Sequence, residues 1–128
     1  MDQRLGKNYK LCSKILIDAL FKEGSRLKSY PLMMRFMSVE KALPAPFQCL
    51  FSVPKRNFKQ AVKRNRIKRL MREAVRKNKH VIEEKIAHSS ENYIVVLMYS
   101  DKKMPSYALI EKRVKTLFEK LPSPKDND

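Results

Sequence analysis

The sequence predicts an α+β fold: a two-layer sandwich in which a small mixed β-sheet packs with about three helices. Segments of helical and strand periodicity follow one another in the order helix, two strands, helix, strand, helix. Each helical segment has one apolar side, and a sheet is the surface that covers such sides. The 128 residues contain no internal repeat and no linker. We therefore expect one domain over residues 1–128, with residues 1–10 and 122–128 flexible.

Residues 13–22 are predicted to form the first helix. Ser13 is suited to cap its start, because a Ser hydroxyl accepts from the free N–H groups of a first turn. Gly24 is a stop signal at its end. The apolar residues recur at helical spacing: Leu11, Ile15, Leu16, Ala19 and Leu20. Residues 25–31, with their cations Arg26 and Lys28, are expected to form a turn region.

Two strands are predicted next, over residues 32–39 and 47–53. The second alternates, with one face formed by Phe47, Cys49, Phe51 and Val53. Residues 40–46 hold two prolines and are expected to form a loop. The two strands are expected to pair antiparallel as one hairpin.

Residues 55–79 hold the densest charge of the chain. They contain twelve Lys and Arg and one acid, Glu73, so they carry eleven of the chain's sixteen excess positive charges. One side of the segment is apolar at helical spacing, with Ile67, Leu70, Met71, Ala74 and Val75. The other side is cationic, with Lys68, Arg69, Arg72, Arg76 and Lys79, Asn65 among them and Arg66 on the flank. We expect one amphipathic helix, capped by Asn57 and continuing as far as residue 85.

The last part of the chain is predicted to form a strand and a helix. Residues 93–99 are apolar throughout, which is typical of a central strand covered on both faces. Residues 87–92 before it are expected to be a loop. Ser106 is suited to cap a final helix with one apolar stripe: Ile110, Val114, Leu117, Phe118 and Leu121.

The charge balance indicates a polyanionic partner. The chain carries a net charge of +16, yet 43% of its residues are hydrophobic, which is too many for a disordered tail. Each cation that contacts a phosphate releases a condensed counterion, and Arg suits bidentate phosphate contact. Nucleic acid is therefore the first candidate, and an acidic membrane surface is the second. Charge alone does not separate DNA from RNA.

Cysteine usage and hydropathy favour a cytoplasmic protein. Cys12 and Cys49 form no short-spaced pair, so we expect two buried small hydrophobes in a reducing compartment. The first ten residues are polar and basic, unlike a signal peptide. The longest apolar run, residues 93–99, is far shorter than the ~20 residues that span a bilayer. We therefore expect no membrane span, and we expect nucleic acid, not a membrane, as the partner.

The chain offers no recognisable catalytic or metal-binding group of its own. The thirteen acids are scattered, and the adjacent Glu83 and Glu84 point to different sides of a helix. A nuclease of protein alone needs clustered carboxylates for its metal ions. His80 and His88 have no third ligand nearby in the sequence, and there is no Gly-rich phosphate loop. We expect no catalytic residue and no metal ligand in this protein.

Residues 52–76 resemble the signature region of the bacterial ribonuclease P protein subunit. The shared features are a strand that ends in Ser-Val, a basic loop, and an Arg-Asn-Arg core followed by Ile-Lys-Arg and Arg-Glu-Ala. The core is Arg64, Asn65 and Arg66 here. The flanks agree too, from the Leu-Phe-Lys-Glu-Gly that ends the first helix to the closing helix after residue 105, so the resemblance covers nearly the whole chain.

The resemblance implies a noncatalytic subunit of a ribonucleoprotein endonuclease. Its partners would be a large catalytic RNA and precursor tRNA, with no obligate protein partner. The RNA, which holds Mg²⁺, would remove the 5′ leader, while the protein grips the leader and lowers the Mg²⁺ requirement. The implied fold is the ribosomal protein S5 domain 2-like fold, with a left-handed βαβ crossover. Carried over by position, the catalytic-RNA-binding residues are Lys55, Arg56, Lys63, Arg64, Asn65, Arg66, Lys68, Arg69, Arg72 and Arg76.

The resemblance also implies a leader-binding cleft between the first helix and the sheet. Phe21 matches an aromatic position of that cleft, while Ile17 and Arg35 stand where aromatic residues are common. Because single strands bind to aromatic platforms and cations, these two departures bear on how bases stack there. For Phe21, a place in the core of the first helix and contact with the leader are equally compatible with the sequence. Phe51 is expected in the core.

Two other classes stay open on the residues alone. The first is a stand-alone nucleic-acid-binding module, such as a ribosomal protein or a DNA-binding protein that reads a groove with its basic helix. The second is a protein-only nuclease, which the missing carboxylate cluster disfavours.

Overall fold

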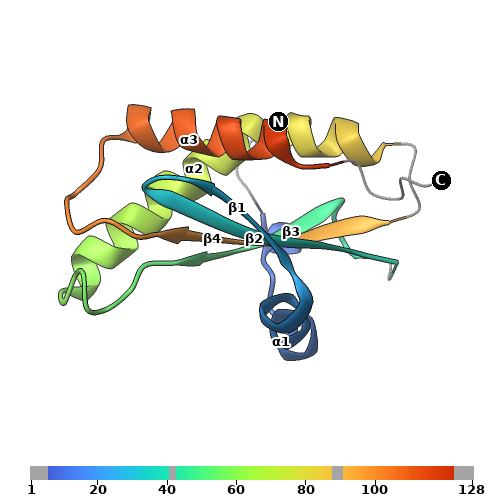
Figure 1. Ribbon diagram of the computed structural model, residues 1–128, viewed down its shortest axis with the longest axis horizontal. Coiled ribbons are helices and arrows are strands. Elements are labelled where there is room, and N and C mark those ends of the chain that lie inside the picture. The colour runs from blue at the N-terminus through green and yellow to red at the C-terminus, as the bar shows by residue number, and fades with distance from the viewer. Residues whose placement is uncertain (1–5, 41–42, 88–90, 123–128) are drawn as a thin grey trace.

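The computed structural model describes residues 6–40, 43–87 and 91–122. Within these residues, three α-helices and a four-stranded mixed sheet confirm the α+β class (Figure 1). A short 3-10 helix, η1, spans Lys7–Tyr9 before the first α-helix. The elements that follow are α1 (Lys14–Glu23), β1 (Ser25–Ser29), β2 (Leu32–Val39), β3 (Phe47–Ser52), α2 (Ala61–Ile86), β4 (Asn92–Tyr99) and α3 (Tyr107–Lys120).

The sheet has the strand order β1-β2-β4-β3. β4 pairs antiparallel with β2 and parallel with β3, so β3, α2 and β4 form a parallel crossover unit. The expected hairpin of β2 with β3 is therefore wrong. β4 is the most apolar strand and is buried along nearly its whole length, so it takes the central place between them.

β1 corrects a second expectation, because residues 25–29 form an edge strand and not a turn. β1 pairs antiparallel with β2, from Ser25 opposite Phe36 to Ser29 opposite Leu32. Four of its five residues are polar, and the apolar Leu27 packs against the main core. Charged side chains are usual on such edges, since they discourage pairing with another chain.

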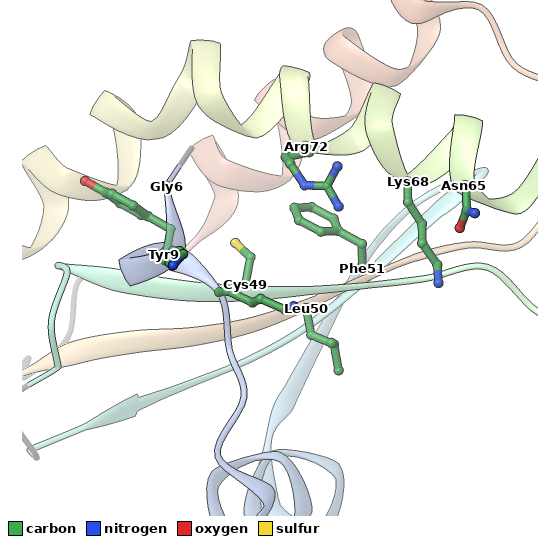
Figure 2. A pocket seen from close by; sticks show the side chains of 10 residues that line it. Gly6, Tyr9, Cys49, Leu50, Phe51, Asn65, Lys68 and Arg72 are labelled. Atoms are coloured by element: carbon green, nitrogen blue, oxygen red, sulfur yellow. The ribbon is translucent and has the colours of Figure 1, made fainter. Parts of the chain in front are cut away.

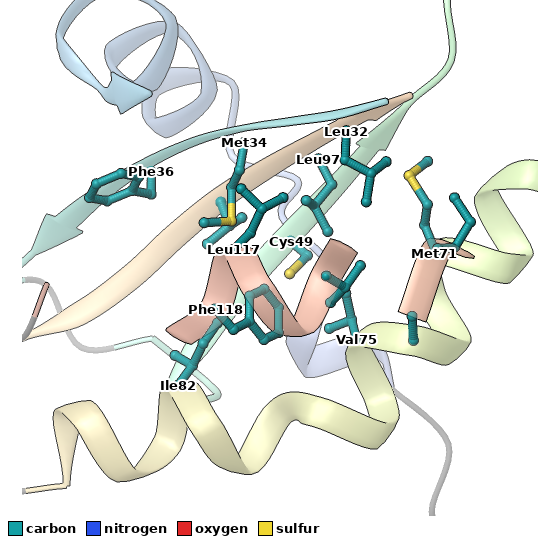
Figure 3. Close-up of a cluster of buried hydrophobic side chains, with 14 of the residues drawn as sticks. Leu32, Met34, Phe36, Cys49, Met71, Val75, Ile82, Leu97, Leu117 and Phe118 are labelled. Carbon is teal, nitrogen blue, oxygen red and sulfur yellow. The ribbon is translucent and has the colours of Figure 1, made fainter. Parts of the chain in front are cut away.

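The core lies on both faces of the sheet. α2 and α3 cover one face and α1 lies on the other (Figure 1). Along β4, Tyr93, Val95 and Leu97 point into the main core, while Ile94 and Val96 point into a smaller cluster with Leu11 and Leu20. This alternation confirms that β4 is a central strand covered on both faces. Figure 3 shows side chains of the main core from α2, α3 and the sheet: Leu32, Met34, Met71, Val75, Ile82, Leu97, Leu117 and Phe118.

Most predicted helix ends are confirmed. The Ser13 and Ser106 hydroxyls accept hydrogen bonds from the N–H groups of Leu16 (3.3 Å) and Leu109 (3.2 Å). Gly24 is the C-terminal cap of α1. The expected cap of α2 by Asn57 is wrong, because the chain forms a turn at Asn57 and the helix begins only after Gln60.

The two cysteines differ in environment. Cys49 is buried in the main core as expected, whereas Cys12 is exposed just before α1, which corrects that part of the prediction. Burial raises the pKa of the Cys49 thiol far above its ordinary value, so this thiol stays protonated. Among the described helices, none combines the length and the hydropathy that a membrane span requires.

Candidate nucleic-acid interface

The face of α2 that points away from the core carries most of the predicted RNA-binding residues. Its buried side includes Ile67, Met71 and Ile82. Arg66 and Arg69 lie on the opposite side, and neither is hydrogen-bonded or ion-paired within the described residues. Of the ten predicted residues, seven are exposed: Lys55, Arg56, Lys63, Asn65, Arg66, Arg69 and Arg72.

The turn between β3 and α2 is held against the protein, and it displays Lys55 and Arg56. Phe58 in this turn is buried near the ring of Tyr99, at a centroid distance of 6.2 Å. Arg64 Nη1 donates to the carbonyl oxygens of Phe58 (2.8 Å) and Lys59 (2.9 Å). Half-buried Arg64 therefore fixes the turn as well as being a candidate for RNA contact.

Arg76 is also partly engaged within the protein. Its Nε donates to Glu73 Oε1 at 3.1 Å, and its Nη2 contacts Glu73 Oε2 in a salt bridge. The hydrogen bond from Arg76 holds the pKa of the Glu73 carboxyl below its ordinary value. The single acid of residues 55–79 is thus neutralised, so the other charged side chains of this segment are all positive.

The N-terminal strap, residues 6–11, lies along the free edge of β3. The Leu11 N–H donates to Cys49 O (2.9 Å), and Gln48 Nε2 donates to Asn8 O (2.9 Å). Lys10 forms an isolated parallel bridge with Cys49. Residues 7–10, which lie within the segment expected to be flexible, thus form a 3-10 helix and a bridge to β3; residues 1–5 lie outside the described part.

Tyr9 ties this strap to α2. Its hydroxyl donates to Glu83 Oε2 at 2.8 Å, and its ring meets Phe47 edge to face at 5.2 Å. Lys79 Nζ lies 4.9 Å from the centroid of the same ring. Burial, reinforced by the hydrogen bond to Glu83, raises the pKa of Tyr9 to about 12. Glu83, on α2, is therefore a structural acceptor that holds the strap.

The strap, β3 and α2 enclose a pocket of about 510 Å³ (Figure 2). In Figure 2, Asn65, Lys68 and Arg72 extend from α2 toward β3, and the Arg72 guanidinium lies over the Phe51 ring. The guanidinium carbon is 5.6 Å from the ring centroid. Half-buried Phe51 packs against the core, as expected, but it also lines this pocket. The complete lining is Gly6, Lys7, Tyr9, Lys10, Cys49, Leu50, Phe51, Asn65, Lys68 and Arg72.

Sequence reasoning missed the strap's share of this surface. Lys7 and Lys10 lie about fifty residues before the start of the basic helix, so no local charge pattern joins them to it. The available signal was Tyr9, a lone aromatic residue in a polar, basic segment. A lone aromatic residue in such a segment indicates that the segment is anchored to the core.

The predicted leader-binding residues lie together on the other face of the sheet. The guanidinium carbon of Arg35, on β2, is 5.5 Å from the centroid of the Phe21 ring. Arg35 Nη1 also donates to Phe21 O at 3.4 Å. Phe21 is 42% exposed, so its reading as a core residue of the first helix is wrong. Ile17 is half-buried and packs against the smaller core cluster.

The described residues show no cluster of metal ligands. Within them, no three His, Cys, Asp or Glu side chains gather as ligands of a metal ion would. The two surfaces instead combine cations with exposed or half-buried aromatic rings. This is the chemistry of single-stranded nucleic-acid binding, in which cations track the backbone and rings stack on bases.

A family model described as "Ribonuclease P" matches residues 5–122. The chain belongs to the ribonuclease P protein family. It is 32% identical over 108 residues to the "Ribonuclease P protein component" of Porphyromonas gingivalis, covering 84% of this chain and 79% of that protein. It is 42% identical over 77 residues to the protein of the same name from Chlorobaculum tepidum, covering 58% and 50%. A ribonuclease P protein component is an RNA-binding subunit of a tRNA-processing ribonuclease, so RNA is its partner.

Solved ribonuclease P proteins share the fold. The protein from Thermotoga maritima superposes with a TM-score of 0.68 at 20% identity, covering 88% of this chain and 96% of that one. The protein from Staphylococcus aureus superposes with a TM-score of 0.66 at 18% identity, covering 88% and 94%. At these identities the likeness establishes the architecture.

Proposed function

We propose that this protein helps a bacterial catalytic RNA to remove the 5′ leader of precursor tRNA, and that it binds both RNAs on separate faces. The observation that carries the proposal is the arrangement of two cationic, aromatic surfaces on opposite faces of one sheet. One is formed by α2, its preceding turn and the strap. The other is formed by Phe21 and Arg35.

The α2 surface is proposed to bind the catalytic RNA. Its exposed cations are free to contact phosphates, and the helix holds them at fixed spacing. Contact with several phosphates releases counterions and supplies most of the affinity. Neutralising phosphates that crowd a folded RNA also lowers the need for Mg²⁺, so the protein is proposed to lower the Mg²⁺ requirement of the complex as well.

The Phe21–Arg35 surface is proposed to bind the leader. One face of the Phe21 ring is occupied by the Arg35 guanidinium, and the exposed remainder is open to a base. Ile17 beside it is apolar but has no aromatic face. The surface therefore offers one stacking platform and one cation to a single strand.

The chemical step is proposed to belong to the RNA. The described residues contain no carboxylate cluster that fits a pair of Mg²⁺ ions, so the protein does not match that ion as a ligand set. Its residues bind and position; the RNA would hold the metal. The exposed thiol of Cys12 suits a reducing compartment such as the cytoplasm, where we expect the complex to work.

Equilibrium binding of labelled tRNA to the assembled complex tests this assignment. Precursor tRNA should bind more tightly than mature tRNA when the protein is present, and about equally with the catalytic RNA alone. Equal affinities for the two tRNAs in the presence of the protein would contradict a leader-binding role. Binding of duplex DNA with sequence preference would instead indicate a DNA-binding protein that reads a groove.

A further inference from the structure

The pocket between the strap, β3 and α2 has a chemical composition that phosphate binding alone does not explain. A surface that only screens phosphates needs cations, whereas this pocket also has the Phe51 ring, Leu50 and the Asn65 amide in its lining. Its volume of about 510 Å³ lies in the ~300–1,000 Å³ range of sites that take small organic ligands. A duplex is too wide for such a space, but one nucleotide fits.

The pocket combines four cations with an aromatic ring. Lys7 and Lys10 come from the strap, and Lys68 and Arg72 come from α2, with no carboxylate in the lining. The Arg72 guanidinium is 5.6 Å from the centre of the Phe51 ring, so a cation and a π-face are already side by side (Figure 2). Cations of this kind bind phosphate, and rings and guanidinium planes stack on bases.

The edge of β3 adds backbone groups that can read a base. Cys49 O accepts from the strap, and Pro46 O accepts from Tyr93 of β4. Because the hydrogen-bonding direction alternates along a strand, Phe51 presents its N–H and C=O on the same outer side as Cys49. β3 is an edge strand, and the strap leaves it after Leu11 for α1 on the other face. The Phe51 backbone and the Asn65 amide therefore offer both donors and acceptors to the edge of a base.

We propose that this pocket binds one unpaired nucleotide of the partner RNA, with its phosphate held by Lys68, Arg72 and the strap lysines and its base placed against Phe51. This inference rests on the proposed function, since it refines how the α2 surface binds the catalytic RNA. It adds recognition of an unstacked base to an interface that otherwise contacts the sugar-phosphate backbone. The strap closes one side of the pocket, so its attachment through Tyr9 is part of the site.

The test compares Phe51→Leu with Tyr30→Leu in complexes of the full chain with the bacterial catalytic RNA. Phe51→Leu keeps an apolar side chain but removes the aromatic face. Tyr30→Leu also removes an aromatic face, together with a hydroxyl that interacts with Asp101, at a 58% exposed ring between β1 and β2, away from the pocket. Circular dichroism melting checks that each variant is folded. Affinity, its salt dependence and the chemical reactivity of each RNA nucleotide are then measured.

The expected result is a five- to thirtyfold weaker complex for Phe51→Leu, which is about the effect of one lost base–ring stack. The slope of affinity against salt should stay unchanged, because no charge is removed. One unpaired nucleotide that is protected in the wild-type complex should become reactive again. Tyr30→Leu should behave as wild type in all three measurements.

Asn65→Ala is a second variant, whose exposed position leaves folding unaffected. It should expose the same nucleotide and weaken binding about three- to tenfold. Wild-type affinity and an unchanged reactivity pattern in both pocket variants overturn the nucleotide pocket while leaving the proposed function intact. Failure of the wild-type chain to bind the catalytic RNA overturns the proposed function and the pocket together.

Discussion

Removal of Arg66 or Arg69 is the sharpest test of the α2 surface. Both side chains are exposed, point away from the core and have no partner among the described residues, so the fold should be unaffected by either change. If each contacts a phosphate, Arg66→Ala or Arg69→Ala should weaken assembly with the catalytic RNA by roughly 1–3 kcal/mol at moderate salt.

The salt dependence gives an independent magnitude. Each lost phosphate contact reduces the slope of log affinity against log salt by about 0.7 to 0.9. A slope change of about 0.8 corresponds to roughly a threefold smaller loss of affinity when salt rises fourfold. The double variant should show about twice that change in slope. Filter binding or fluorescence titration over a range of salt concentrations measures both quantities.

Lys28→Ala is the matched control. Lys28 is an exposed cation on β1, at the edge of the sheet opposite β3. Its removal lowers the net charge by the same amount as each Arg variant, and charges more than ~10 Å apart are screened at 0.1 M salt. Wild-type slopes in the Arg variants, with their fold intact, would refute the assignment of this surface to phosphate contact.

Three further outcomes are expected. Phe21→Ala should reduce the preference of the complex for precursor over mature tRNA by roughly 1–3 kcal/mol, which is the cost of one stacked base. Its assembly with the catalytic RNA should be unchanged. If the wild type and the variant each bind both tRNAs equally, Phe21 does not bind the leader. The pKa of Tyr9 is raised from 10.0 to about 12 in the folded state, so its contribution is complete below pH 10 and lost between pH 10 and 12. The difference in unfolding free energy between wild type and Tyr9→Phe should accordingly shrink from pH 8 to pH 11, and a difference that stays constant would contradict this linkage. Gly24→Ala should destabilise the fold by about 1–3 kcal/mol in urea unfolding, because its Cβ would clash with the backbone carbonyl oxygen of Leu20 and lie 2.7 Å from Leu20 Cδ1. An unchanged unfolding free energy would contradict this steric argument.

Local sequence signals predicted the helices and the central strand well. Ser13 and Ser106 cap helices as expected, and the stripe from Ile110 to Leu121 is buried. These features depend on periodicity and on capping within a few residues, which the chain shows directly.

The pairing of strands could not be predicted in the same way. β4 lies between β2 and β3 although it follows both in the chain, and its position depends on which strand gains most from burial on both faces. β1 has a single apolar residue, Leu27, so no alternation of apolar and polar residues identified it. It forms a strand because its backbone pairs with β2, and its own side chains do not indicate this.

The functional surface was predicted only in part, because some of its contacts also join residues that are far apart in the chain. The resemblance identified the cations of α2, which lie within one continuous helix. Tyr9 joins them to the strap through a hydrogen bond to Glu83, 74 residues further along, and a contact of that separation leaves no trace in local spacing. Arg64 belongs to the Arg-Asn-Arg core, for which the resemblance implied RNA contact. It also donates hydrogen bonds to carbonyl oxygens of the preceding turn, a structural role that the resemblance did not indicate.

Cleavage of a 5′-labelled precursor tRNA at low Mg²⁺ tests the central claim most directly. The reaction is run with the bacterial catalytic RNA alone, with the protein alone, and with both. Leader removal only in the mixture is the predicted result, and it would assign catalysis to the RNA and assistance to the protein. Cleavage by the protein alone, or no gain when the protein joins the RNA, would contradict the account.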